Sequence, residues 1–127
     1  MLVAVYGTLR RRGRWNYLLG KSPLLGETTT PPSYTMFWPQ AANYPHVVDR
    51  GDTPITVEVY DCPADVVDIL DNLESVPYNY VHHQVETTFG PALMYVAAPR
   101  VRDLLLNSNP RRVVSGNWMD FPENLEV

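Results

Sequence analysis

Glu74 is the residue whose type and position best suit acid–base chemistry. It follows Leu73 directly and Leu70 by four positions, so it lies at the margin of the apolar face of a helix predicted over residues 63–74. A carboxylate there faces the negative end of the helix dipole, and Asp71 adds a like charge. Partial burial, the dipole and Asp71 would all raise its pKa, as a general base near neutral pH requires. Taken alone, this position is more typical of a solvent-exposed glutamate in a helix-ending turn.

A second candidate is the turn after the N-terminal strand. Residues 2–5 are small, branched or apolar and predict a buried strand, which Gly7 ends. Such a turn can direct the amide hydrogens of Gly7, Thr8 and Leu9 into one concavity, where they would bind an anion or an oxyanion. Spacing alone is weak evidence, because a strand followed by glycine is common and a plain tight turn explains it equally.

The elements that must position these groups follow from apolar periodicity. The helix over residues 63–74 begins with Pro63 at its first position and carries a stripe of Val66, Ile69, Leu70 and Leu73. The remaining expectations are strands at 24–29, 34–38, 55–60, 80–87 and 92–97, an extended piece at 47–48, a polar turn at 49–52, a short helix at 15–19 and a helical turn at 103–106. The pattern predicts an α+β fold: a small mixed sheet of five to seven strands with one main helix and short helical turns.

The composition limits the class of protein. The 127 residues predict a single domain over 1–127, with Trp118 and Phe121 packing the irregular C-terminal segment onto its body. A net charge of −4 disfavours nucleic acid as a partner, and no apolar run approaches the roughly 20 residues of a membrane span. One cysteine, Cys62, excludes an internal disulfide and fits a reducing compartment. With no signal peptide at the N-terminus, we expect a cytoplasmic protein.

Two segments resemble a known family when they are taken together. Residues 6–9 read Tyr-Gly-Thr-Leu, and residues 70–80 read Leu-Asp-Asn-Leu-Glu-Ser-Val-Pro-Tyr-Asn-Tyr. They resemble the Tyr-Gly-Ser/Thr-Leu turn and the Leu-Asp-x-x-Glu-Gly-x-Pro-x-x-Tyr segment of the gamma-glutamylcyclotransferase-like, or AIG2-like, family. Shorter similarities occur in order at residues 16–19, 25–27, 44–45, 58–60 and 115–118, so the resemblance covers nearly the whole chain.

The resemblance implies a reaction and assigns roles. In catalytic members the glutamate at the place of Glu74 is the general acid/base, and the substrate is a small gamma-glutamyl compound that cyclises to 5-oxoproline and releases an amine. The turn amides of Gly7, Thr8 and Leu9 would stabilise the oxyanion, and Tyr6 and Tyr80 would line the pocket. The family fold implies a compact barrel-like sheet, and the reaction needs no metal or organic cofactor. Oligomeric state is not indicated.

One further residue, Arg10, adjoins the turn and could reach a substrate carboxylate. The other arginines of residues 10–14 are expected to lie in a solvated loop.

Two departures from the family pattern keep another class of protein open. Ser75 stands where the family usually has glycine, and Val81 where it commonly has arginine. A catalytically silent protein could use the same pocket to bind a small ligand or a peptide end.

A second alternative is a nucleophilic Cys62 paired with His46, His82 or His83, although a small cysteine at a strand end is more often a packing residue. His82 and His83 alternate across a strand, which disfavours a zinc site.

Overall fold

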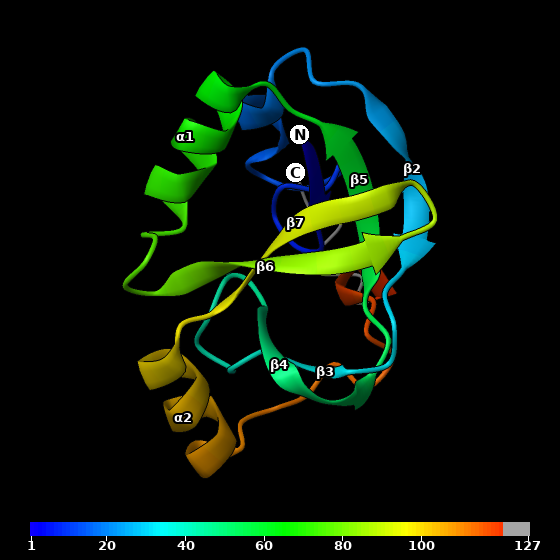
Figure 1. Cartoon of the computed structure of the whole chain (residues 1–127). Coiled ribbons are helices and arrows are strands. Elements are labelled where there is room, and N and C mark those ends of the chain that lie inside the picture. The colour runs from blue at the N-terminus through cyan, green and yellow to red at the C-terminus, as the bar shows by residue number, and fades with distance from the viewer. Residues whose placement is uncertain (121–127) are drawn as a thin grey trace.

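The computed structural model describes residues 1–120, and seven strands and two α-helices form within them (Figure 1). In chain order the elements are β1 (Leu2–Val5), the 3₁₀ helix η1 (Asn16–Leu19), β2 (Leu24–Thr29), β3 (Tyr34–Phe37), β4 (His46–Thr53), β5 (Thr56–Asp61), α1 (Ala64–Leu73), β6 (Tyr80–Thr87), β7 (Gly90–Ala97), α2 (Pro99–Ser108) and the 3₁₀ helix η2 (Trp118–Asp120). The strand and helix content confirms the predicted α+β class, with a second helix that the sequence pattern predicted only as a turn.

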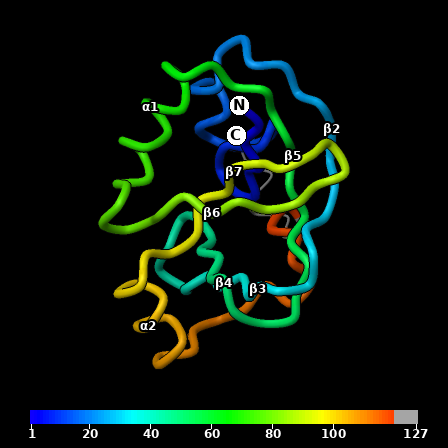
Figure 2. The backbone as a smooth tube through the Cα atoms, in the orientation of Figure 1, coloured from blue at the N-terminus to red at the C-terminus, as the bar shows by residue number. Residues whose placement is uncertain are grey.

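Strand β1 lies at the centre of a five-stranded mixed sheet of order β2-β5-β1-β7-β6. It pairs antiparallel with β5 and parallel with β7, and the trace in Figure 2 follows it between these neighbours. Strands β3 and β4 form a separate antiparallel pair. The turn that leaves β1 is therefore held on both sides by the sheet.

Both faces of β1 are covered, which explains why this strand is uncharged and apolar throughout. Val3 and Val5 point into a core with α1 and η1, whereas Ala4 and Tyr6 point into a core with the β3–β4 pair. Figure 1 shows α1 beside the larger sheet and α2 at the far end, next to β3 and β4. Tyr6 consequently points into the core that the larger sheet shares with the β3–β4 pair.

Helix α2 is longer than the helical turn expected at residues 103–106. Pro99 begins it at the first turn, where a missing amide hydrogen has no cost, and Asn109 ends it in a left-handed conformation at φ 46°. Within the helix only Leu105 is buried, and it packs in a cluster with Phe37 and Val48. A helix with so narrow a buried face leaves little apolar periodicity in the sequence.

Residues 49–52, predicted as a polar turn, instead continue β4. The strand bulges opposite Tyr34 and Thr35, where Gly51 has φ 138° and a Cβ would collide with the Thr35 side chain. The hydroxyl of Thr35 donates a hydrogen bond of 2.8 Å to the carbonyl of Arg50. Polar residues occur here because this half of the strand is exposed.

The predicted burial of α1 is partly wrong. Leu70 is fully buried, as expected, but Ile69 is 44% exposed and Val67 is buried in its place. In the C-terminal segment Trp118 is 3% exposed and packs in the core, as predicted, whereas Phe121 lies outside the described residues. No helix within residues 1–120 is both long and apolar enough to cross a membrane.

Candidate active site

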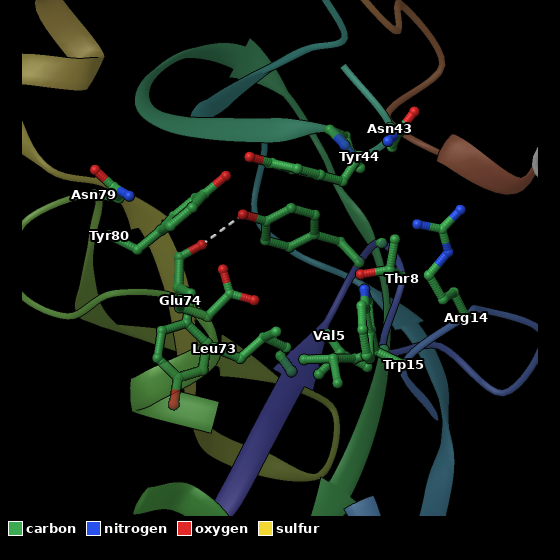
Figure 3. A pocket seen from close by; sticks show the side chains of 16 residues that line it. Val5, Thr8, Arg14, Trp15, Asn43, Tyr44, Leu73, Glu74, Asn79 and Tyr80 are labelled. Atoms are coloured by element: carbon green, nitrogen blue, oxygen red, sulfur yellow. Dashed lines mark hydrogen bonds between the residues drawn. The ribbon is translucent and has the colours of Figure 1, made fainter. Parts of the chain in front are cut away.

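A cavity of about 300 Å³ brings the two candidate segments together, although Glu74 lies 65 positions after Leu9 in the sequence. Figure 3 shows the carboxylate of Glu74 pointing into this cavity, with Tyr80 on its side and Thr8, Trp15 and Arg14 on the opposite side. The lining residues are Ala4, Val5, Tyr6, Gly7, Thr8, Leu9, Arg14, Trp15, Asn43, Tyr44, Pro45, Leu73, Glu74, Asn79, Tyr80 and Tyr95. The volume is at the lower end of that found in small-molecule sites.

The C-terminal cap of α1 fixes the backbone of Glu74. The amide of Glu74 donates to the carbonyl of Leu70 at 2.9 Å, and those of Ser75 and Val76 donate to Asn72 at 3.2 Å and to Asp71 at 3.0 Å. These last two bonds form a Schellman motif, with Ser75 at the left-handed position, φ 53°. Glycine is favoured at this position, which gives a physical reason for the family's glycine there.

Burial raises the pKa of Glu74 from 4.5 to about 7. Within the described part of the chain, no group donates a hydrogen bond to its carboxylate that would counteract this effect. The carboxyl group therefore changes protonation state near neutral pH, and its pKa is shifted upward, as the sequence predicted.

Asp71 is not a cause of this shift, contrary to the sequence prediction. Its carboxylate accepts hydrogen bonds from the Tyr95 hydroxyl at 2.6 Å and pairs with His82 Nε2 at 2.7 Å. Burial acts to raise the pKa of Asp71, but these two partners together lower it. Asp71 therefore remains ionised within its own hydrogen-bonded group.

The turn after β1 is fixed by its own backbone bonds. The amide of Arg10 donates to the carbonyl of Gly7 at 3.0 Å, and that of Trp15 donates to Thr8 at 2.9 Å. Gly13 packs directly on the Thr8 carbonyl, where a Cβ would collide with the oxygen. The amides of Gly7, Thr8 and Leu9 donate no hydrogen bond to any group of residues 1–120, so they remain available to a ligand in the cavity.

Tyr6 and Tyr80 both line the cavity, as predicted. The hydroxyl of Tyr6 donates to the backbone carbonyl of Tyr95 at 2.6 Å. The hydroxyl of Tyr80 lies 2.5 Å from Nδ1 of His46, whose ring stacks on that of Tyr80. Burial raises the pKa of both tyrosines, and the nearby Glu74 adds to this effect. Both hydroxyls are thus neutral at physiological pH and held in fixed positions.

Arg10 does not line the cavity, and its guanidinium has a structural role instead of the predicted substrate contact. It is 3% exposed and bonds to Glu58 at 2.8 Å, Asn117 at 2.7 Å and Glu27 at 3.0 Å. Glu58 also accepts from the amide of Arg11 at 2.8 Å. These partners tie the end of the turn to the larger sheet, so the side chain cannot reach a ligand without breaking them.

Cys62 is 1% exposed in the core beneath α1 and does not contribute to the cavity. Burial raises the pKa of its thiol, which opposes the reactivity that the alternative Cys–His pair would need.

Several cavity residues were not singled out from the sequence, among them Arg14, Trp15, Asn43 and Tyr95. Arg14 belongs to a loop expected to be merely solvated, and Tyr95 to an apolar strand that carries no functional signal. Tyr44 and Pro45 also line the cavity, and they form one of the shorter similarities to the family. That similarity was the sequence signal from which their place in the site could have been predicted.

Sequence comparison identifies the family. The chain matches the family described as "Gamma-glutamyl cyclotransferase, AIG2-like" over residues 3–120. The protein therefore belongs to the gamma-glutamylcyclotransferase-like family, as the two motifs suggested.

Individual relatives agree with this assignment. A Vibrio cholerae protein named "Putative gamma-glutamylcyclotransferase" is 38% identical over 75% of this chain and 80% of its own. The gamma-glutamylcyclotransferase family protein YtfP of Citrobacter rodentium is 30% identical over 94% of this chain and 96% of its own.

Solved structures show the same fold. An uncharacterized protein of Pyrococcus horikoshii has a TM-score of 0.77 at 25% identity, covering 94% of this chain and 91% of that one. YtfP of Escherichia coli has a TM-score of 0.70 at 27% identity, covering 94% and 97%. The arrangement of strands around the cavity is thus that of the family.

Proposed function

We propose that the protein is a gamma-glutamyl cyclotransferase: it converts a small gamma-glutamyl compound to 5-oxoproline and releases the attached amine. The observation that carries the proposal is the position of Glu74, a carboxyl group with a pKa of about 7 in the same cavity as three available turn amides. Such a pair supplies the two things an acyl transfer needs, a proton acceptor and an oxyanion site. The reaction would take place in the cytosol, in keeping with the single unpaired cysteine.

The reaction joins two groups of one molecule. Glu74 takes a proton from the α-ammonium group of the substrate, and the resulting amine nitrogen attacks the γ-carbonyl carbon. The carbonyl oxygen becomes an oxyanion, which the amides of Gly7, Thr8 and Leu9 stabilise. The bond to the leaving nitrogen then breaks as Glu74 returns the proton to it. The ring nitrogen loses its second proton to the released amine, which leaves as an ammonium ion, so the products are 5-oxoproline and RNH₃⁺. The walls need only hold the folded conformer, because both reacting groups arrive together.

Tyr6 and Tyr80 support this mechanism because their side chains are neutral, line the cavity and are held in place by hydrogen bonds. Tyr6 is anchored on the Tyr95 carbonyl and Tyr80 on His46, so neither hydroxyl competes with Glu74 for a proton. Their aromatic faces exclude water from the reacting carbonyl, which favours attack by the amine over hydrolysis.

The alternative is a silent binding protein that uses the same cavity, and the departures at Ser75 and Val81 are what favour it. Ser75, however, adopts the left-handed conformation that the cap of α1 requires, so its presence leaves Glu74 in place. Val81 is partly buried on β6 and does not line the cavity. These observations favour the enzyme over the binding protein.

The test is release of 5-oxoproline from a panel of gamma-glutamyl amino acids, gamma-glutamyl amines and glutathione. Wild type is compared with Glu74→Gln and with Glu86→Gln, which removes a similar charge from the exposed face of β6. We expect release by wild type and Glu86→Gln, and a loss of at least about 100-fold in Glu74→Gln. Undiminished release by Glu74→Gln would remove Glu74 as the base. Thermal stabilisation by these compounds without any release would identify a binding protein.

A further inference from the structure

Three phenol hydroxyls lie close enough to Glu74 for its charge to act on them. They belong to Tyr6, Tyr80 and Tyr95: burial raises the pKa of each, and Glu74 adds to this effect. The hydroxyl of Tyr6 donates its one proton to the carbonyl of Tyr95 at 2.6 Å, and that of Tyr95 donates to Asp71 at 2.6 Å. Two of the three possible donors are therefore directed away from the Glu74 carboxylate.

The third donor, the hydroxyl of Tyr80, is held by His46. Nδ1 of His46 lies 2.5 Å from this hydroxyl and is its one hydrogen-bond partner among residues 1–120. A buried hydroxyl rarely leaves its proton without an acceptor. Burial lowers the pKa of His46, so the imidazole is neutral near pH 7 and can carry its single proton on Nε2. Tyr80 is therefore the donor of this bond and Nδ1 its acceptor.

His46 itself is fixed from several sides, although it does not line the cavity. It begins β4 and pairs with Phe37 of β3. Its ring lies nearly parallel to that of Tyr80, with centroids 5.8 Å apart, and meets the ring of Tyr44 at 5.2 Å. Both tyrosines line the cavity, and in Figure 3 the phenol of Tyr80 extends away from the carboxylate of Glu74, toward the side of Tyr44. The imidazole thus holds a wall of the cavity from outside.

We propose that His46 is a positioning residue for Glu74: by accepting the proton of the Tyr80 hydroxyl, it keeps this donor away from the carboxylate. The inference rests on the proposed function, in which Glu74 is the base. A hydroxyl that donated to the carboxylate, directly or through a water, would stabilise its ionised form and lower its pKa. Glu74 would then take up a proton less readily near neutral pH.

The surrounding groups leave this part to Tyr80 alone. The titratable or charged side chains around Glu74 and His46 are Tyr6, Arg14, Tyr44, Asp71, Tyr80 and Tyr95. Burial accounts for the raised pKa of Glu74 and for the lowered pKa of His46, without a contribution from these charges. Within residues 1–120 only the hydroxyl of Tyr80 has His46 as its acceptor. Loss of the imidazole should therefore act on Glu74 through Tyr80.

The experiment follows the titration of Glu74 by carbon-13 NMR of the glutamate carboxyl groups, without substrate. The signal is assigned by its absence in Glu74→Gln. The variants are Tyr80→Phe, His46→Phe, which keeps an aromatic ring but removes the acceptor, and His46→Asn, whose amide oxygen can replace Nδ1. The matched control is His83→Phe, because His83 bonds to the hydroxyl of Tyr34 at 2.9 Å and neither residue lines the cavity.

We expect a midpoint near pH 7 in wild type, His46→Asn, Tyr80→Phe and His83→Phe, and one about 1 pH unit lower in His46→Phe. The double variant His46→Phe/Tyr80→Phe should return to about 7, because it has no hydroxyl left to donate. An unchanged midpoint in folded His46→Phe would overturn the assignment. A lowered midpoint that persists in the double variant would do the same, since the effect would not pass through the Tyr80 hydroxyl.

A second measurement needs no variant at position 46. Nitrogen-15 NMR of the wild-type imidazole distinguishes a protonated ring nitrogen from an unprotonated one. At pH 7 we expect His46 to carry its proton on Nε2, and a proton on Nδ1 would refute the proposal. Absence of 5-oxoproline release would refute the proposed reaction but leave both NMR tests of His46 intact. If release is observed, the pH midpoint of kcat/KM should move with the titration in the same variants.

Discussion

The buried carboxyl of Glu74 should make the stability of the protein depend on pH in a way that one substitution removes. The pKa of this group is about 7 in the folded protein and 4.5 in the absence of burial. At about 1.4 kcal/mol for each factor of ten, this difference corresponds to about 3 kcal/mol. Because the raised pKa belongs to an acid, the folded state favours its protonated form.

The sign follows from comparing the folded and unfolded states. Below about pH 4.5 Glu74 is largely protonated in both, and burial of the neutral group costs little. Between about pH 4.5 and 7 the unfolded chain releases the proton while the folded protein retains it, so stability falls as pH rises. Above about pH 7 the folded protein carries the full cost of a buried charge. Glu74→Gln has no such charge, so its stability relative to wild type should rise from near zero at pH 4 to about 3 kcal/mol at pH 8.

The assay is urea denaturation of wild type and Glu74→Gln at pH 4, 6 and 8, with Glu86→Gln as the control for loss of an exposed charge. Taking the difference between proteins at each pH cancels the contributions of all other titrating groups. We expect the difference to grow with pH for Glu74→Gln and to stay within about 0.5 kcal/mol for Glu86→Gln. A Glu74→Gln difference that does not change with pH would show that burial leaves this carboxyl unperturbed.

Three further predictions concern the site and its support. Ser75→Gly should stabilise the protein to urea by up to about 1 kcal/mol, because glycine relieves the left-handed strain at φ 53°; a loss of stability would contradict that origin. Arg10→Met should lower the free energy of unfolding by about 3 kcal/mol or more, because it leaves the carboxylate of Glu58 buried without its partner. Adding Glu58→Gln should restore part of that free energy. Equal stability of the single and double variants in chemical denaturation would argue against a buried ion pair. For wild type, kcat/KM should rise with pH through a midpoint near 7, because Glu74 must be ionised to accept a proton, and a profile flat between pH 5 and 9 would exclude it.

The elements of the fold could be predicted where burial makes apolar residues recur at the regular spacing of a strand or a helix. Residues 55–60 alternate because Ile55, Val57 and Val59 face an apolar core, whereas Glu58, also buried, meets Arg10 on the other face. The apolar run of β1 reflects burial against apolar groups on both faces. The full length of α2 was not predicted because only Leu105 of this helix is buried. The strand at residues 49–52 was not predicted because an exposed strand with a bulge contains the same residue types as a turn.

The site was predictable for the groups that belong to continuous motifs. Glu74, Tyr80 and the turn after β1 could be proposed because each lies in a short segment whose pattern is visible in the sequence. The places of Arg10 and Arg14 could not be assigned in this way. Arg10 is buried by Glu58, 48 residues away, and by Asn117, 107 residues away, and no local pattern shows which of two nearby arginines these partners will hold.

The two sides of the cavity differ in what holds them. Glu74 is set by a helix cap, and Tyr6 directly follows a strand at the centre of the sheet, so changes there would disturb the core. The mouth is made by connecting segments, with Arg14 between β1 and η1 and Tyr44 between β3 and β4. Insertions, deletions and substitutions in such segments are tolerated far better than in the core. Under the proposed reaction, a lineage can therefore alter which amine is released while Glu74 and its helix cap are inherited unchanged. Exchanging these two loops between relatives should then transfer substrate range with the fold intact.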